Sequence, residues 1–185
     1  MKKAMGKRLH RGNLFREYPR LGRRLSHKDL GGQPLLQRDF GREQNCTLTA
    51  LAFLFGAECY GRILEIALHY RYRREHGGTD PFRIRAIMRD CCASFGTDGV
   101  CRVAYGKGIG YDFRKIREIL EDGRYLLLNL LGDGRRYYRG HTVTVIGYEE
   151  YAHGRFLLVY DHWNTSCSYI DYRRLCVISS INWLA

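Results

Sequence analysis

The chain has 185 residues, 45% hydrophobic and 27% charged, a composition that fits one globular domain and excludes an intrinsically disordered chain. No run of about 18 apolar residues is present to span a membrane, and no apolar segment follows the basic first residues as it would in a secretory signal. Seven scattered cysteines, none in a Cys-x-x-Cys pair, favour free thiols in a cytoplasmic protein over a disulfide framework or a zinc site.

The net charge of +12 is concentrated at the N-terminus. Residues 1–28 carry ten of the 31 Lys and Arg and a single acid, Glu17, so they hold +9 and the rest of the chain holds +3. We therefore divide the chain into a basic N-terminal arm, residues 1–30, expected to be partly disordered, and a folded domain, residues 31–185. Such an arm suits an acidic partner, nucleic acid included, although a solvated arm is the simpler interpretation.

Four helices are predicted in the first part of the domain. Residues 45–56 form an almost wholly apolar, buried helix, which Asn45 can cap and Gly56 can close in the left-handed conformation. The other three helices cover residues 62–75, 80–92 and 113–121. Their ends carry residues typical of helix termini, such as a proline at the first position and aspartate caps.

Strand-like segments follow the helices. The candidates cover residues 125–131, 141–148, 155–160, 169–170 and 177–181, and residues 132–134 form a turn. Helices first and strands later is the segregated α+β pattern. We therefore expect N-terminal helices packed on a C-terminal antiparallel sheet.

Three residues at the ends of these elements have the side chains that thiol catalysis needs. Cys46 follows Asn45 at the start of the buried helix, where the helix field lowers the pKa of a thiol and free N–H groups can bind an oxyanion. His141 begins one strand and Asp161 ends the next, so a hairpin of these strands would put them at facing ends. Each residue alone has an ordinary structural interpretation, but together they predict a catalytic triad of nucleophile, base and orienting carboxylate.

The same segments resemble the C39-like peptidases of the papain-like cysteine peptidase clan. Residues 44–51, Gln-Asn-Cys-Thr-Leu-Thr-Ala-Leu, look like the nucleophile helix of that family, and residues 140–148 look like its Gly-His-x-Val-x-Val-x-Gly-Tyr strand. Residues 160–164 look like its Asp-Pro/Ala-Trp motif. The resemblance covers residues 33–183 and implies a papain-like cysteine proteinase fold with the three roles given above.

The chain departs from that family next to the cysteine. Thr47 stands where the family has glycine, and Phe40 lies where its oxyanion glutamine is often found. Gln37 and Gln44 are the candidates for that glutamine in the oxyanion hole. Gln37 is favoured because Gln-Arg-Asp, residues 37–39, resembles the Gln-x-Asp of some members.

Residues beside these motifs have further interpretations. Asn45 and Trp163 are expected at the cleft, Trp163 as a packing lid over the triad, and His162 as the variable position of the aspartate motif. The glycine-rich residues 106–110 lack the spacing of a phosphate loop and are interpreted as a flexible loop.

The sequence therefore predicts a cysteine peptidase or amide hydrolase that acts through a thioester acyl-enzyme and needs no metal or other cofactor. Its substrate would be a peptide or a small amide. Three alternatives stay open: an acyltransferase of the same fold, a catalytically degenerate module that binds peptides, and a nucleic-acid binder that uses residues 1–30.

Overall fold

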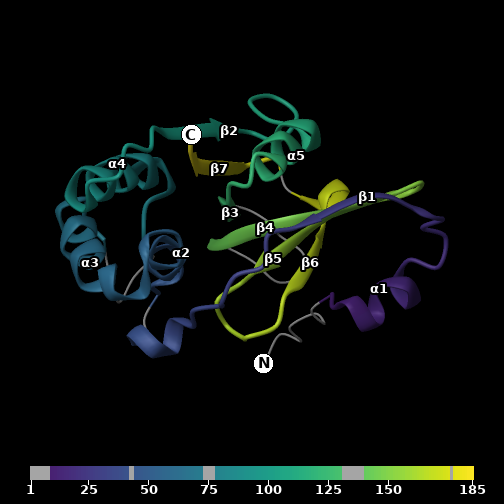
Figure 1. Cartoon of the computed structure of the whole chain (residues 1–185), viewed down its shortest axis with the longest axis horizontal. Helices are drawn as coiled ribbons and strands as arrows, with labels where there is room; N and C mark the ends of the chain where they lie inside the picture. The colour runs from purple at the N-terminus through teal and green to yellow at the C-terminus, as the bar shows by residue number, and fades with distance from the viewer. Residues whose placement is uncertain (1–8, 42–43, 73–77, 131–139, 176) are drawn as a thin grey trace.

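The computed structural model describes residues 9–41, 44–72, 78–130, 140–175 and 177–185, and in that part of the chain it has five α-helices and a seven-stranded antiparallel sheet (Figure 1). The helices are α1 (Arg11–Glu17), α2 (Cys46–Phe55), α3 (Tyr60–His69), α4 (Ile84–Phe95) and α5 (Phe113–Glu121). The strands are β1 (Arg24–Asp29), β2 (Cys101–Tyr105), β3 (Leu126–Leu130), β4 (His141–Tyr151), β5 (Gly154–Tyr160), β6 (Ser168–Asp171) and β7 (Ser179–Leu184). The mixed content and the antiparallel sheet agree with the predicted α+β class.

β4 is the strand around which the sheet is built. The sheet order is β2-β7-β3-β4-β5-β6, and β1 joins it by pairing with β4. β3 pairs with residues 141–145 of β4 and β1 with residues 147–151, so β3 and β1 follow one another along β4. A Cβ at Gly147 would overlap the carbonyl oxygen of Lys28, so the close approach of β1 requires glycine there.

Helices cover the sheet in separate groups (Figure 1). α2, α3 and α4 lie together at one end, where their apolar faces share a core that reaches the sheet through Leu127. α5 packs on the sheet through Phe113, Ile116 and Leu120, all buried with residues of β3, β4 and β5. This arrangement leaves the start of α2 beside the start of β4, and the two elements are in direct contact.

The basic N-terminal segment is part of the folded unit from residue 9 onward. Leu14 of α1 and Leu21 are buried at 0% and 2% exposure in a core with Ile146 and Phe156. β1 adds five residue pairs to the edge of β4. Residues 9–30, assigned to an arm from their charge, therefore contribute a helix and a strand, and only residues 1–8 of that arm lie outside the described residues.

Several predicted boundaries agree with the structure. α5 spans the predicted residues 113–121, and the Asp112 carboxylate accepts the N–H of Lys115 at 2.8 Å as the predicted cap. α4 stops ahead of Gly96 as expected, at Phe95 and so three residues beyond the predicted residue 92, and Gly96 has a left-handed backbone with φ 63° and ψ 32°. β3, β4, β5 and β6 each coincide with a predicted strand to within three residues.

Other boundaries were wrong. The helix predicted over 62–75 is α3, which ends at residue 69, and the helix predicted from residue 80 begins as a 3₁₀ turn, η3 (Pro81–Arg83), before α4. Gly56 has a positive φ of 111° but an extended ψ of 142°, so it does not close α2 in the left-handed conformation. The last strand is β7, which starts two residues later than predicted and runs to residue 184. The predicted turn at residues 132–134 lies outside the described residues.

Candidate functional site

The start of α2 meets the start of β4, and this contact brings Cys46 to His141. Cys46 is the first residue of α2, His141 is the first residue of β4, and their side chains are hydrogen-bonded. The next residue on each element makes a second link, because Thr47 Oγ1 lies 2.8 Å from Thr142 Oγ1. Two residues predicted as nucleophile and base are therefore neighbours in space.

The His141 ring is fixed by its other nitrogen. Nε2 lies 2.9 Å from the backbone carbonyl oxygen of Asp161. Because a carbonyl can only accept, Nε2 carries the proton in the neutral ring and Nδ1 is left as the acceptor for the Cys46 thiol. The Trp163 ring lies against the imidazole with ring centroids 4.3 Å apart, which limits rotation of the ring further.

Asp161 is completely buried directly after β5. Its Oδ1 accepts the backbone N–H of Trp163 at 3.1 Å, while its main-chain carbonyl supplies the 2.9 Å contact to His141. The carboxylate therefore holds the turn that carries Trp163, and the orientation of the imidazole has a main-chain component that the sequence analysis did not include.

The predicted hairpin of β4 and β5 is present, but the facing ends differ from the prediction. Tyr160 pairs with Thr144, so β4 extends three residues beyond the end of β5 before it reaches His141. The register shifts between Val145 and Gly147, where β4 carries one extra residue. Asp161 reaches His141 because the chain turns after β5 and not because the two residues pair across the ladder.

The environment of Cys46 favours its thiolate. Burial by itself raises the pKa of the thiol. The hydrogen bond and the charge of His141, the backbone N–H of Thr142 and the Thr47 side chain act in the opposite direction and lower the pKa from 9.0 to about 7. A substantial fraction of Cys46 is therefore ionised near neutral pH.

A chain of polar side chains leads to the sulfur from inside the sheet. Asn129 Nδ2 donates to Thr142 Oγ1 at 2.8 Å, and Thr142 Oγ1 lies 2.8 Å from Thr47 Oγ1. Because the Thr47 hydroxyl donates to the Cys46 thiolate, which can only accept, the hydroxyl proton between the two threonines comes from Thr142. Thr47, a departure from the family pattern, thus supplies a donor that glycine lacks. This role is not visible in the sequence because the three residues lie on different elements.

Asn45 does not cap α2 with its side chain. Its Nδ2 donates instead to the carbonyl oxygen of Gln37 at 3.2 Å and to the Tyr60 hydroxyl at 3.1 Å. The first N–H groups of a helix have no partner within the helix. With the Asn45 side chain turned away, it does not occupy the N–H groups beside Cys46.

The two glutamines differ in their surroundings. Gln37 begins a 3₁₀ turn, η1 (Gln37–Phe40), and its backbone N–H donates to the carbonyl of His162 at 2.9 Å. Its side-chain Nε2 is buried and has no hydrogen-bond partner among the residues that the structure describes. Gln44 is exposed and lines the cavity that Cys46 also lines.

His162 connects η1 to the sheet. The residue is fully buried, its Nδ1 donates to the carbonyl of Leu35 at 2.9 Å, and its Nε2 lies 2.9 Å from Thr144 Oγ1. Its φ of 61° is uncommon outside glycine. Burial lowers the pKa of His162 from 6.5 to about 4, so the ring is neutral at pH 7. His162, interpreted from sequence as a variable position, therefore holds the segment that carries Gln37.

A cavity of about 130 Å³ opens beside Cys46. Its walls come from α2, from the segment before η3, and from the ends of β3 and β4; they include Cys46, Thr47, Thr79, Asn129 and Thr142. Pockets for drug-sized ligands are about 300–1,000 Å³, so this cavity is smaller than such pockets. The lining is mainly of small and polar residues.

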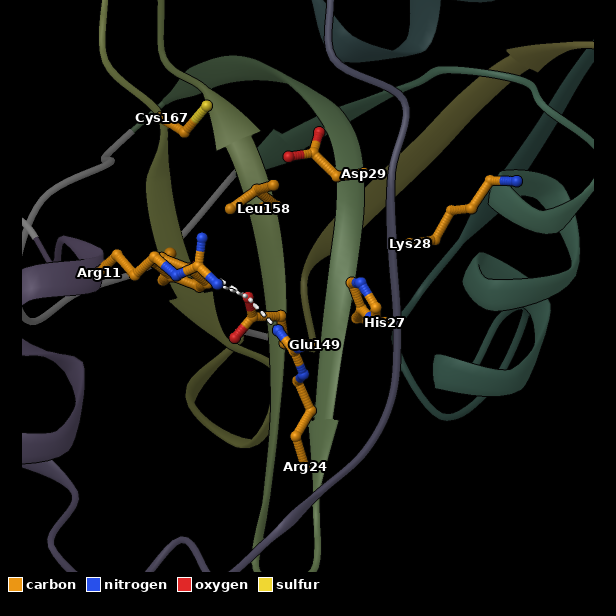
Figure 2. Close-up of a pocket in the computed structure, with 9 residues that line it drawn as sticks. Arg11, Arg24, His27, Lys28, Asp29, Glu149, Leu158 and Cys167 are labelled. Atoms are coloured by element: carbon orange, nitrogen blue, oxygen red, sulfur yellow. Dashed lines mark hydrogen bonds and ion pairs between the residues drawn. The ribbon is translucent and has the colours of Figure 1, made fainter.

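A second cavity, of about 350 Å³, lies on the opposite part of the sheet between α1, β1 and β4–β6 (Figure 2). Figure 2 shows Arg11 and Arg24 reaching toward the buried Glu149. The nitrogen–oxygen distances of these two ion pairs are 3.9 and 3.7 Å. The Glu149 carboxylate also accepts hydrogen bonds from the Tyr151 and Tyr169 hydroxyls, at 2.5 and 3.1 Å. These contacts use the basic segment to neutralise a buried acid, which is a structural role.

The glycine-rich loop at residues 106–110 is an ordered turn. Lys107 Nζ donates to the backbone carbonyls of Tyr172, Arg173 and Leu175, at 3.0, 3.2 and 2.7 Å. Its ammonium group is occupied by these backbone carbonyls, so residues 106–110 form a hydrogen-bonded turn in place of the expected flexible loop.

Within the described ranges, no helix is long and apolar enough to cross a membrane, and no cluster of three or more His, Cys, Asp or Glu residues has an arrangement that could hold a metal ion. A scan against protein-family models finds no match, and a search of curated proteins finds no relative.

Proposed function

We propose that the chain is a papain-like cysteine hydrolase that cleaves a peptide or a small amide through a thioester. The observation that carries the proposal is the hydrogen bond between Cys46, at the start of α2, and His141, whose Nε2 is held by the Asp161 carbonyl. This is the geometry that a thiol nucleophile and its base require. A lowered thiol pKa next to a cavity is consistent with the same role.

The proposed reaction begins with transfer of the Cys46 thiol proton to Nδ1 of His141. The sulfur then forms a bond to the substrate carbonyl carbon, and the carbonyl electron pair moves to oxygen. When that oxyanion collapses, the carbon–nitrogen bond breaks and the imidazolium gives its proton to the leaving amine. Water, deprotonated by the same imidazole, releases the acyl group from sulfur.

The oxyanion requires donors that are already in position. The backbone N–H of Cys46 is one candidate, since it belongs to the first turn of α2 and the Asn45 side chain is directed elsewhere. Gln37 is our first choice for the side-chain donor, because its buried Nε2 has no partner in the described part of the chain and its backbone N–H donates to His162. Gln44, exposed at the rim of the cavity, is the alternative.

Labelling with iodoacetamide at pH 7, followed by mass spectrometry, tests the activation of Cys46. We expect Cys46 to be alkylated with a pH midpoint near 7 and faster than the other thiols. An ordinary midpoint, equal to that of the other thiols, would contradict the proposal and favour a degenerate peptide-binding module. Once a substrate is found, competition between water and added amines distinguishes a hydrolase from an acyltransferase.

We also propose a cytoplasmic location and an acidic partner for the N-terminal residues. The six cysteines among the described residues are free thiols, as expected in a reducing compartment. Residues 1–8 hold Lys2, Lys3, Lys7 and Arg8. Deleting residues 1–30 would also remove β1 and two buried leucines, so the appropriate test is deletion of residues 1–8 alone. Salt-dependent binding of nucleic acid that this deletion abolishes would support the acidic partner.

A further inference from the structure

β2 forms an open edge of the sheet. It stands at the end of the strand order, with β7 as its neighbour, and none of the described strands pairs with its other side. An open edge presents unpaired N–H and C=O groups that another extended chain can use.

The register identifies the outward groups. Val100 and Ala185 exchange both backbone hydrogen bonds, at 3.1 and 2.9 Å, just before β2 pairs with β7. Hydrogen-bonded pairs alternate along an antiparallel ladder, so Arg102 and Ala104 bond to β7 in the same way. The N–H and C=O groups of Cys101 and Val103 therefore point away from β7.

A cavity of about 540 Å³ borders this edge. Val103 and Tyr105 form one wall, and Phe82, Arg85 and Arg89 of η3 and α4 form the other. Phe82 is 68% exposed, an unusual degree for a phenylalanine, and its ring lies 5.6 Å from that of Tyr105, centroid to centroid. Side chains at alternate positions of an added strand would enter this cavity.

The charge of the cavity is positive. Arg85 and Arg89 are both exposed, and Arg85 has no ion pair with any residue that the structure describes, whereas Arg89 is paired with Asp90 at 2.8 Å. Acidic side chains of a partner would therefore be favoured beside α4. A second copy of this chain, pairing edge to edge through β2, would instead bring two sets of arginines together, which like-charge repulsion opposes.

We propose that β2 binds an extended acidic peptide segment, which adds to the sheet beside Cys101 and Val103, sets apolar side chains against Phe82 and Tyr105, and sets carboxylates near Arg85 and Arg89. Backbone hydrogen bonds give affinity in this mode, and the cavity gives selectivity. The surface does not include Cys46 or His141, so this binding does not depend on the proposed acyl transfer.

The test uses the full chain with Cys46→Ala, so that any hydrolysis is absent. The probe is a fluorescein-labelled ten-residue peptide of alternating valine and glutamate, and the comparison peptide alternates valine and lysine. We expect saturable fluorescence anisotropy with the glutamate peptide only. Amide hydrogen exchange should slow at Cys101 and Val103 when that peptide is present.

Two variants and a matched control separate the contribution of charge from the contribution of backbone hydrogen bonds. Arg85→Glu should weaken binding roughly tenfold or more, while Arg114→Glu, the same charge change at an exposed site on α5, should have little effect. Val103→Pro removes an outward N–H that β7 does not use, so it should abolish binding and leave thermal unfolding unchanged.

Three results would overturn the proposal. Equal affinity for both peptides would contradict the acidic preference. Equal losses of affinity in Arg85→Glu and Arg114→Glu would mean that only the net charge of the protein matters, and not a site beside β2. A dimer in sedimentation that Val103→Pro dissociates would assign the edge to a second copy of the chain.

Discussion

Two groups of thiols in this molecule differ in chemistry although both are shielded from solvent, Cys46 partly and Cys91 and Cys101 fully. Cys46 lies at the start of α2, and Cys91 and Cys101 lie between α4 and β2. Burial raises the pKa at all three positions. The outcome is a pKa of about 7 at Cys46 and about 12 at Cys91 and Cys101.

The difference comes from what faces each sulfur. Cys46 has an imidazole, a main-chain N–H and a threonine hydroxyl, whereas Cys101 has another thiol, Cys92, with the sulfurs 3.5 Å apart. At pH 7 about half of Cys46 is thiolate, compared with about one part in 10⁵ for Cys91 or Cys101. Hydrogen-bond donors and the charge of His141 therefore distinguish Cys46 from the other two thiols, whereas burial alone does not.

Removing the sulfur of Cys46 is the change with the largest expected effect. Because a low-pKa thiolate is intrinsically the weaker nucleophile, Cys46 should react with iodoacetamide faster than Cys91 by a few hundred-fold at pH 7, less than its thiolate excess alone gives. Cys46→Ala should abolish this fast phase, as measured by mass spectrometry of the alkylated peptides. Cys91→Ala is the control and should leave it intact.

His162, unlike Cys46, has a pKa that is set mainly by burial. Its pKa falls from 6.5 to about 4 on folding, so the unfolded chain binds the extra proton below pH 6.5. The contribution of neutral His162 to the free energy of unfolding is fully present above pH 6.5 and is lost as pH falls toward 4. Between pH 7 and pH 5 the free energy of unfolding should therefore fall by about 2 kcal/mol. Urea unfolding at both pH values measures it. In His162→Asn, which tolerates the positive φ, this part of the pH dependence should disappear.

Replacing the base should make Cys46 resemble the other thiols. In His141→Gln the pH midpoint of alkylation should move from near 7 toward 9, and the rate at pH 7 should fall about sixfold. An unchanged midpoint would mean that His141 does not stabilise the thiolate. Circular dichroism of both proteins checks that the variant is folded.

The smallest expected effect is at Thr47. Thr47→Val keeps the shape and removes the last donor of the Asn129–Thr142–Thr47 chain, so the midpoint of Cys46 should rise by about one pH unit. Thr49→Val is the matched control, since Thr49 is also buried in α2 and its hydroxyl donates to the carbonyl of Asn45 at 3.1 Å. Equal midpoints in the two variants would exclude a role for Thr47.

The features that sequence predicted best have local causes. The limits of α5 follow from an aspartate cap and a closing glycine that lie within the segment itself. The candidate site was located from residues at element termini, and the structure brings Cys46 and His141 together. Asp161 touches the imidazole through its backbone, a contact that no side-chain pattern records.

The features that sequence did not predict depend on distant partners. β1, Arg-Leu-Ser-His-Lys-Asp, has no apolar alternation, and it forms a strand because Gly147 lets it approach β4. In the sequence, Thr47 is only a departure from the glycine of the family pattern. Its role as a donor depends on Thr142 and Asn129, which lie on other elements. Gln37 could not be separated from Gln44 without knowing that His162 holds its segment.

The central place of β4 has a consequence for how the protein is made. Cys46 leaves the ribosome about 95 residues before His141 and Thr142, the groups that lower its pKa. Until β4 is synthesised and docked on α2, the nascent chain carries a thiol of ordinary reactivity. A truncated or stalled chain therefore lacks the lowered pKa of Cys46, on which the proposed chemistry depends.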